Sequence, residues 1–222
     1  MDMKHDQIYV TRFSERDRVA KDAIWRVLCK HFFQRYVDDN DVVLDVGPGF
    51  GEFLRHIRCG RRIAADIEPL SGREFPEGTQ ELIVSSDRLS SRVAAGSVDV
   101  VFCSNFFEHL PDKQTFRQTL SEIHVVLKSG GRLLILQPNI RLIGGAYWDF
   151  VDHCLPLTDR TLVEACESLD FETVELIPRF LPYTTRSALP QSPVLVRLYL
   201  RVRPAWWLLG RQTWMVARKR AP

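Results

Sequence analysis

Apolar residues follow two periods along this chain, and the two periods alternate. Short apolar runs of strand length lie near residues 42–46, 62–66, 81–85, 98–103 and 131–137. Between them, apolar residues recur three and four positions apart, which is the spacing of one face of a helix. The clearest case predicts a helix over residues 112–127, with Phe116, Leu120 and Ile123 on one face. Such alternation indicates a parallel sheet covered by helices.

Polar capping residues mark two further helices. The sequence Ser-Glu-Arg-Asp that begins at Ser14 reads as a capping box, and the apolar spacing after it predicts an N-terminal helix over residues 14–36. This helix would precede the sheet and cap it. Thr158 has the character of an N-cap for another helix, which we expect to run to Leu169.

The last third of the chain predicts two strands with a long insertion between them. The strands lie near residues 171–176 and 214–217, and the intervening residues 179–212 are too many for a hairpin turn. Residues 192–193, Ser-Pro, suit the start of a helix, although strand periodicity fits the run that follows almost as well. A second short helix is predicted over residues 204–210, bounded by proline and glycine.

A glycine-rich segment follows the first predicted strand. Residues 44–51 read Leu-Asp-Val-Gly-Pro-Gly-Phe-Gly, so that Gly47, Gly49 and Gly51 alternate along a loop that leads into a helix-forming stretch. Glycines allow positive φ and let a ligand pack against the main chain, while the start of a helix offers free N–H groups. The D-x-G-x-G-x-G series lacks the G-x-G-x-x-G spacing of dinucleotide dehydrogenases, which disfavours a nicotinamide-dependent oxidoreductase.

Four later motifs, together with this glycine series, resemble the class I S-adenosylmethionine (SAM) dependent methyltransferases. They are apolar strands that end in polar residues or begin after glycines, at Asp66, Asp87, Ser104-Asn105 and Gly130-Gly131. The ordered set covers residues 40–140, the expected SAM-binding core. The resemblance implies an α/β, Rossmann-like doubly wound sheet, mostly parallel with an antiparallel last strand. The N-terminal cap helix and the basic, apolar C-terminal insertion would be additions to it.

The resemblance also implies which residues contact the cofactor, SAM. Asp66 would bind the ribose hydroxyls, and Asp87 with the backbone of Arg88 would meet adenine. The glycines would approach the methionine and ribose portions, and Asp45 would steady their loop. The implied cofactor-binding set is Asp45, Gly47, Gly49, Gly51, Asp66, Ile67, Asp87, Arg88, Ser104 and Asn105.

Two histidines, His109 and His153, are the candidates for a catalytic base or a substrate contact. They follow the fourth and fifth predicted strands, near the sheet edge where ligands bind in such folds. A structural hydrogen-bonding role competes with catalysis for each. Some RNA 2′-O-methyltransferases of the family bind a metal through E-x-x-E-H and a distant histidine. Here Asn105 stands in place of the first glutamate, so Asn105, Glu108, His109 and His153 make only a weak metal hypothesis, and we predict no metal.

Composition places the chain among ordinary globular proteins. It has 222 residues, 45% of them hydrophobic and 26% charged, which suits a single domain over residues 1–222. Its five cysteines contain no C-x-x-C pair, so neither a disulfide framework nor a zinc cluster is indicated. We find no secretion signal and no apolar run of about 18 residues. A cytoplasmic protein is expected, with peripheral contact at the inner membrane surface as an extension of that expectation.

Charge is distributed unevenly along the chain. From Leu176 to Pro222 there are nine basic residues and no Asp or Glu, whereas residues 1–175 hold 21 basic and 28 acidic residues. The net charges are therefore +9 and −7. This asymmetry indicates an anionic partner for the C-terminal third.

Three interpretations of the basic segment remain open. It could be a solvated face, a lid that grips substrate, or a membrane-surface contact. For the lid, the residues that could grip the substrate are Arg179, Tyr183 and Arg186, and Tyr147 completes the candidate substrate-binding set. For the membrane, residues 193–211 mix arginines with aromatic and aliphatic residues. Nucleic acid is less favoured, because the basic residues are interleaved with aliphatic ones and no RNA-binding motif is found.

The acceptor atom is predicted from a missing motif. The N/D-P-P-Y/F tetrad of amino-methylating enzymes is absent, because residues 137–139 are Gln-Pro-Asn and residues 104–107 are Ser-Asn-Phe-Phe. We therefore expect SAM-dependent O-methylation of a small-molecule, glycan or lipid-linked acceptor. The alternatives are an RNA methyltransferase and a non-enzymatic SAM-fold regulatory or partner protein.

Overall fold

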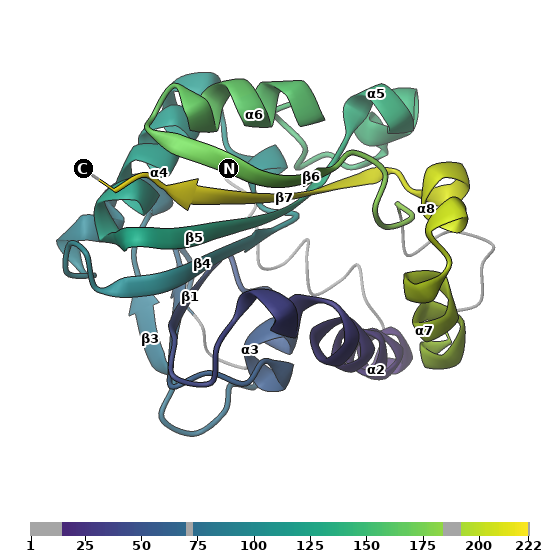
Figure 1. Ribbon diagram of the computed structural model, residues 1–222, viewed down its shortest axis with the longest axis horizontal. Coiled ribbons are helices and arrows are strands. Elements are labelled where there is room, and N and C mark those ends of the chain that lie inside the picture. The colour runs from purple at the N-terminus through teal and green to yellow at the C-terminus, as the bar shows by residue number, and fades with distance from the viewer. Residues whose placement is uncertain (1–14, 70–72, 184–191, 222) are drawn as a thin grey trace.

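The fold is built on one seven-stranded sheet, seen edge-on in Figure 1. The computed structural model describes residues 15–69, 73–183 and 192–221. Its strands are Val42–Val46 (β1), Arg61–Asp66 (β2), Gln80–Ile83 (β3), Val98–Ser104 (β4), Leu127–Pro138 (β5), Phe171–Ile177 (β6) and Gln212–Lys219 (β7). All seven predicted strand regions are thus present.

The order of the strands is β3-β2-β1-β4-β5-β7-β6. The first five strands of this order pair in parallel, whereas β7 lies antiparallel between β5 and β6. The predicted mixed sheet is therefore confirmed. The chain runs outward from β1 to β3 and returns to place β4 on the other side of β1. The carboxyl ends of β1 and β4 form the switch point at which such sheets bind ligands.

Helices fill both sides of this sheet. They are Glu15–His31 (α2), Glu52–His56 (α3), Lys113–Val126 (α4), Ile140–Ile143 (α5), Asp159–Glu167 (α6), Pro193–Arg201 (α7) and Arg203–Leu209 (α8). Short 3₁₀ turns cover Phe33–Tyr36 (η1), Ser86–Ser91 (η2), Phe107–His109 (η3) and Gly144–Asp149 (η4). None of the helices within the described ranges has the length and apolar content needed to cross a membrane.

Capping side chains start the helices as the sequence predicts. The Asp112 carboxylate accepts from the backbone N–H of Thr115 at 2.7 Å, and Thr158 Oγ1 accepts from the N–H of Thr161 at 3.0 Å. These bonds satisfy donors that the first turn of a helix leaves unpaired. The predicted N-terminal helix corresponds to α2 and η1, and its proposed cap, Ser14, lies outside the described residues.

Alternating residues of each central strand point into two separate cores. In β1, Leu44 packs with residues of α4 and α6, whereas Val43 packs with residues of α2 and α3. The second core is rich in aromatic rings. Phe32, the residue after α2, stacks on Phe180 with ring centroids 4.1 Å apart, and both contact the fully buried Trp214 of β7. An N-terminal helix and the C-terminal segment therefore share one apolar cluster.

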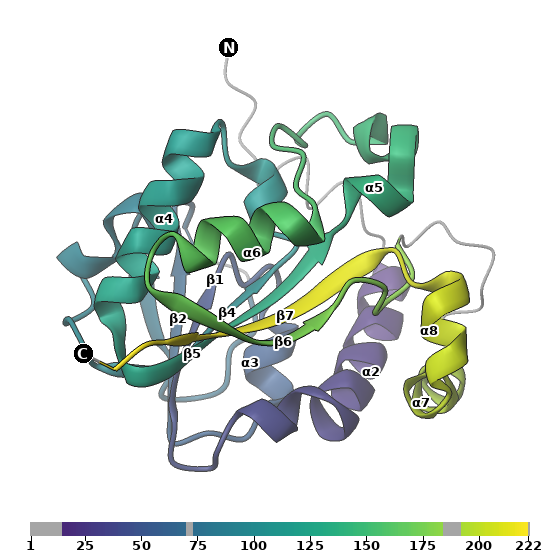
Figure 2. The ribbon, with the colours of Figure 1, turned by 45° about the horizontal axis from the view of Figure 1, so that its top comes forward.

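The insertion before β7 folds back onto the same side as α2. It forms α7 and α8, so the helical interpretation of residues 193–201 is confirmed over the strand alternative. Both views place these two helices at one end of the molecule, beside α2 (Figures 1 and 2). Trp206 of α8 is buried against Phe32 and Phe180, which anchors the pair of helices.

Two predicted strand boundaries are wrong. The third strand ends at Ile83, so Asp87 lies in η2 and does not follow the strand directly. The polar residues after Ile83 bond locally: Ser85 Oγ donates to Asp87, and Ser86 Oγ bonds Thr119 Oγ1 of α4 at 2.9 Å. Such side-chain bonds compete with a strand ladder. The fifth strand begins at Leu127, ahead of its glycine turn.

Candidate functional site

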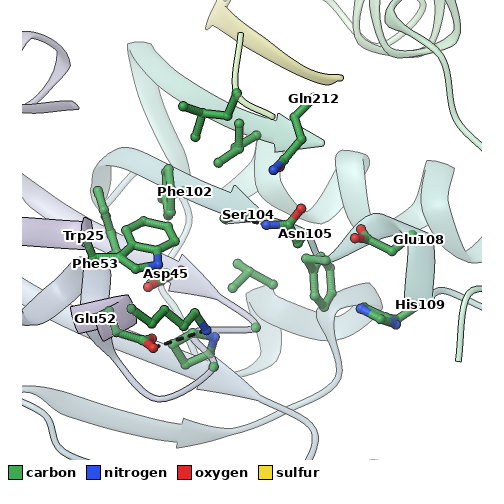
Figure 3. A pocket seen from close by; sticks show the side chains of 18 of the residues that line it. Trp25, Asp45, Glu52, Phe53, Phe102, Ser104, Asn105, Glu108, His109 and Gln212 are labelled. Carbon is green, nitrogen blue, oxygen red and sulfur yellow. Dashed lines mark hydrogen bonds and ion pairs between the residues drawn. The ribbon is translucent and has the colours of Figure 1, made fainter. Parts of the chain in front are cut away.

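A cavity of about 1030 Å³ opens at the carboxyl ends of β1, β2 and β4 (Figure 3). Ligand pockets usually measure roughly 300–1,000 Å³, so this cavity has room for a cofactor and a second molecule. One end is lined by the glycine loop and by acidic residues. The other end is lined by aliphatic residues of α7, α8 and the residue between them: Leu195, Val196, Leu198, Val202 and Leu209.

The glycine loop forms the floor of the first end. Gly47 and Gly49 line the cavity with φ angles of +68° and +56°, a region that favours glycine. A Cβ on Gly47 would lie 2.4 Å from the ring of Phe106, which follows β4. Gly51, at φ +85°, is not among the lining residues; it precedes the first residue of α3. The loops after β1 and β4 can therefore touch only because residue 47 has no side chain.

Acidic groups dominate the electrostatics of this end. The lining residues here include five acids, Asp45, Glu52, Asp66, Glu68 and Asp87, and two cations, Lys21 and Arg73. Burial raises the pKa of the Asp45 carboxyl well above its usual range, and the charges of Glu52 and Asp66 raise it further. A cluster in which acids outnumber cations fits a ligand that carries positive charge.

The residues predicted to contact the ribose and the adenine make hydrogen bonds within the protein, and most of them line the cavity. Asp66 lies at the end of β2, and its Oδ2 accepts from Arg73 Nη1 at 2.7 Å. The backbone N–H of Glu68 donates to Asp66 Oδ1 at 3.1 Å. Asp66, Ile67 and Asp87 all line the cavity, whereas Arg88 does not. The N–H of Arg88 instead donates to the carbonyl of Ser85 at 3.0 Å.

Asn105, which lines the cavity, has an unusual backbone conformation. It has a φ of +47°, a left-handed conformation that Asn tolerates better than most residues, and such strain gathers at functional sites. Its N–H donates to the carbonyl of Leu136 at 2.8 Å, and its side chain bonds Ser104 Oγ at 3.3 Å. Ser104 and Asn105 both line the cavity, between Asp45 and His109 in the view of Figure 3.

His109 and His153 come together beside the cavity, with ring centroids 5.2 Å apart. His109 Nδ1 lies 3.0 Å from the carbonyl oxygen of Asp152 and 3.4 Å from its Oδ2. His153 Nδ1 lies 2.9 Å from the carbonyl oxygen of Tyr147. A carbonyl oxygen can only accept, so each Nδ1 carries a proton and each neutral ring has its lone pair on Nε2.

Glu108 is the third member of this cluster. It is buried, and Gln137 Nε2 donates to its Oε2 at 3.0 Å. Burial raises the pKa of the Glu108 carboxyl, although neighbouring His109 acts in the opposite direction. One ligand atom each of Glu108, His109 and His153 lie within 4.8 Å of one another, a donor set that could hold a divalent metal. Our prediction of no metal stays a prediction.

The four predicted substrate contacts have different positions. Tyr183 lines the cavity, but Tyr147 is fully buried in the core, where its hydroxyl donates to the carbonyl of Leu155. Arg179 is not a lining residue; its Nη1 donates to the carbonyl of Trp207 at 3.2 Å. Arg186 lies outside the described residues. Among the described residues, Tyr183 is therefore the only one of the four that lines the cavity.

Several lining residues are ones that the sequence did not single out. Lys21 and Trp25 reach the cavity from α2, and Lys21 Nζ pairs with Glu52 Oε1 at 3.2 Å. Gln212 reaches it from β7 (Figure 3). Arg73, the partner of Asp66, comes from a loop. The only sequence signal for Lys21 is its position beside the apolar stripe of α2. That position does not predict which part of the protein the helix covers.

Comparison with known proteins yields a family match. A family model described as "Methyltransferase domain" matches residues 14–176. One similar solved structure is a chain in the complex between the Haloferax volcanii Trm112 methyltransferase activator and a candidate methyltransferase; the TM-score is 0.70, the identity 19%, and both chains are covered completely. A SAM-dependent methyltransferase from Archaeoglobus fulgidus has a TM-score of 0.65 and 20% identity, covering 97% of this chain and 100% of its own. No curated protein matches this chain.

Substitution of Gly47 tests the glycine floor. We expect Gly47→Ala to weaken binding of S-adenosylhomocysteine, the product form of the implied cofactor, by about tenfold or more, because its Cβ displaces the Phe106 ring into the cavity. Gly130→Ala is the matched control: φ is +75°, yet no atom lies within 4 Å of its added Cβ. Both variants carry a strain of about 1–2 kcal/mol. Equal affinities of the two variants in titration calorimetry would contradict the role of Gly47.

Proposed function

Because the chain belongs to the methyltransferase-domain family, it is a SAM-dependent methyltransferase, and we propose that it methylates an oxygen of a small-molecule, glycan or lipid-linked acceptor. The observation that carries this proposal is the division of the cavity. Its acidic end suits the cofactor, and its aliphatic end, formed by α7 and α8, leaves space for an acceptor with an apolar portion.

The residues at the acidic end fit SAM. Gly47 and Gly49 leave a floor without side chains, and Asp66 presents a carboxylate at the end of β2 for the ribose hydroxyls. The excess of acids near Asp45 complements a ligand with a sulfonium and an ammonium group. When bound, SAM supplies a methyl group on a positively charged sulfur. The protein then has to hold the acceptor oxygen in line with that group.

The aliphatic end performs this alignment. Leu195, Leu198 and Val202, from α7 and the turn after it, line the cavity together with Phe150 and Leu181. Correct placement of two reactants can lower the activation free energy by roughly 7–11 kcal/mol, which is more than a general base usually does. The arginines of the C-terminal third are not among the described lining residues, so an anionic part of the acceptor would stay outside.

His109 is the residue that we assign to proton removal. Its Nδ1–H is directed to the carbonyl of Asp152, and the Asp152 carboxylate lies close enough to stabilise a positive ring. Nε2 then holds the lone pair that accepts the proton of an acceptor hydroxyl. His153 is held in the same way by Tyr147 and supports the cluster; it is the second candidate for this role.

A methyl-transfer assay on a whole-cell extract tests the acceptor class. Methyl-labelled SAM is incubated with extract and with wild-type protein or Asp66→Asn, and label is counted in organic-phase lipids, water-soluble small molecules, RNA and protein. The extract also supplies any protein subunit, such as the activator in the Haloferax complex. We expect label in the lipid or small-molecule fraction that is lost with Asp66→Asn and kept with Asp39→Asn, an exposed control.

Label in RNA alone would instead favour the RNA methyltransferase alternative. No label in any fraction, from a protein that binds S-adenosylhomocysteine, would favour the non-enzymatic alternative. Both results would contradict the proposed acceptor.

The role of His109 is tested with His109→Gln. Glutamine can still donate to the Asp152 carbonyl but has no basic nitrogen, so we expect kcat to fall by about 10²–10⁴-fold with little change in S-adenosylhomocysteine affinity. His153→Gln is the matched comparison and should have the smaller effect. A His109→Gln enzyme with the wild-type kcat would contradict the assignment.

A further inference from the structure

The surface of α7 and α8 is unusually apolar for a part of the chain that contacts solvent. Large hydrophobic side chains that are exposed number fifteen in the described residues, and seven of them lie between residues 194 and 209. They are Val194, Leu195, Leu198, Val202, Trp207, Leu208 and Leu209. Contiguous exposed apolar surface of this kind marks an interaction site.

The exposed residues lie on one side of α7 and α8, and the other side of these helices is packed against the protein. On the inner side, Trp206 is buried and its Nε1–H donates to the carbonyl of Tyr199 at 2.8 Å, while the Tyr199 hydroxyl bonds the carbonyl of Phe180. On the outer side, the next residue, Trp207, is 72% exposed and Leu198 is 57% exposed. The outer residues are therefore held facing solvent by the packing of the inner ones.

Positive charge borders the same surface. Arg197, Arg201 and Arg203 are exposed on α7 and α8, and no acidic residue occurs between Leu176 and Pro222. Lys30, at the end of α2, lies near these arginines: desolvation lowers the pKa of His31, and the charges of Arg197, Lys30 and Arg201 lower it further, so the imidazole itself adds no positive charge. Tryptophan and leucine flanked by arginine form the pattern of a segment that lies in a membrane interface.

The outer face also adjoins the cavity. Leu195, Leu198, Val202 and Leu209 are exposed and at the same time line its aliphatic end. With nine and seven residues, α7 and α8 are too short to span a bilayer. Both ribbon views show them at one end of the molecule, away from α4 and α6 (Figures 1 and 2).

We propose that the outer face of α7 and α8 docks on a bilayer that contains anionic phospholipids and takes the acceptor from it. This face is defined by the exposed residues Val194, Arg197, Leu198, Arg201, Arg203, Trp207 and Leu208. Arginines of this face meet the lipid phosphates, and the exposed tryptophan and aliphatic side chains enter the interface. An acceptor with an apolar chain then passes along Leu195 and Leu198 to the cavity. The second step rests on the proposed function, whereas the docking does not.

Co-sedimentation of the full chain with vesicles tests the docking. We expect wild-type protein to bind vesicles of phosphatidylcholine mixed with phosphatidylglycerol, to lose this binding as salt is added, and to bind phosphatidylcholine alone weakly. The charge reversal Arg197→Glu/Arg201→Glu should weaken binding to the anionic vesicles by about tenfold or more. Trp207→Ser should weaken it several-fold by removing the interfacial ring.

Matched controls use exposed residues elsewhere. Arg92→Glu/Arg117→Glu changes the net charge equally, and Trp148→Ser removes an indole that is 54% exposed. Both controls should bind the vesicles as wild type does. Failure of wild-type protein to bind anionic vesicles would overturn the docking, and so would equal losses in variants and controls. A dimer in sedimentation velocity that Trp207→Ser dissociates, without vesicle binding, would assign the face to a second copy of this chain.

Two readouts separate this inference from the proposed function. All variants of the outer face should bind S-adenosylhomocysteine with wild-type affinity, since none of the substituted residues belongs to the cofactor end. A protein that binds vesicles but transfers no label to lipids or small molecules retains the docking and loses the proposed function. If the protein labels such a fraction but does not bind anionic vesicles, the proposed function stands and the docking is rejected.

Discussion

The parallel pairing of β1 with β4 is the interaction on which the candidate site depends. Its register sets Val46 opposite Cys103, so the two strands end side by side and their loops must share one small space. Gly47 makes this geometry compatible with Phe106, because any side chain at position 47 would collide with that ring. The same meeting places the glycine loop, Asn105 and the histidines around one cavity, where a methyl donor and an acceptor can be held in line.

A second constraint joins the two ends of the chain. One aromatic cluster joins Phe32, the residue after α2, with Phe180 and Trp206 of the insertion and Trp214 of β7. This packing places α2 beside the cofactor end of the cavity and α7 and α8 beside the proposed acceptor end. The cavity is therefore completed by elements that lie outside residues 40–140. Because the inner side of α7 and α8 is used for this anchoring, their outer side remains available to bind a partner.

The sequence predicts most of the sheet and the glycine loop because these follow local rules. Strand periodicity, caps such as Asp112 and Thr158, and glycines with positive φ are encoded within a few residues. It does not predict the parts of the site that depend on tertiary packing. Lys21 and Trp25 enter the cavity only because α2 covers it, and Tyr147, expected at the substrate, is held in the core by the Leu155 carbonyl. Arg179, expected to grip an anion, instead bonds a backbone carbonyl of α8.

The most direct test of this account is a crystal structure of the full chain with S-adenosylhomocysteine. The account predicts that the ribose hydroxyls bond Asp66, that the adenine lies near Asp87, and that the sulfur faces the aliphatic end between Asn105 and His109. It would be contradicted by a ligand bound elsewhere on the protein. A sulfur directed away from His109 and the α7–α8 end would also contradict it, because the acceptor could not then reach the methyl group from that side.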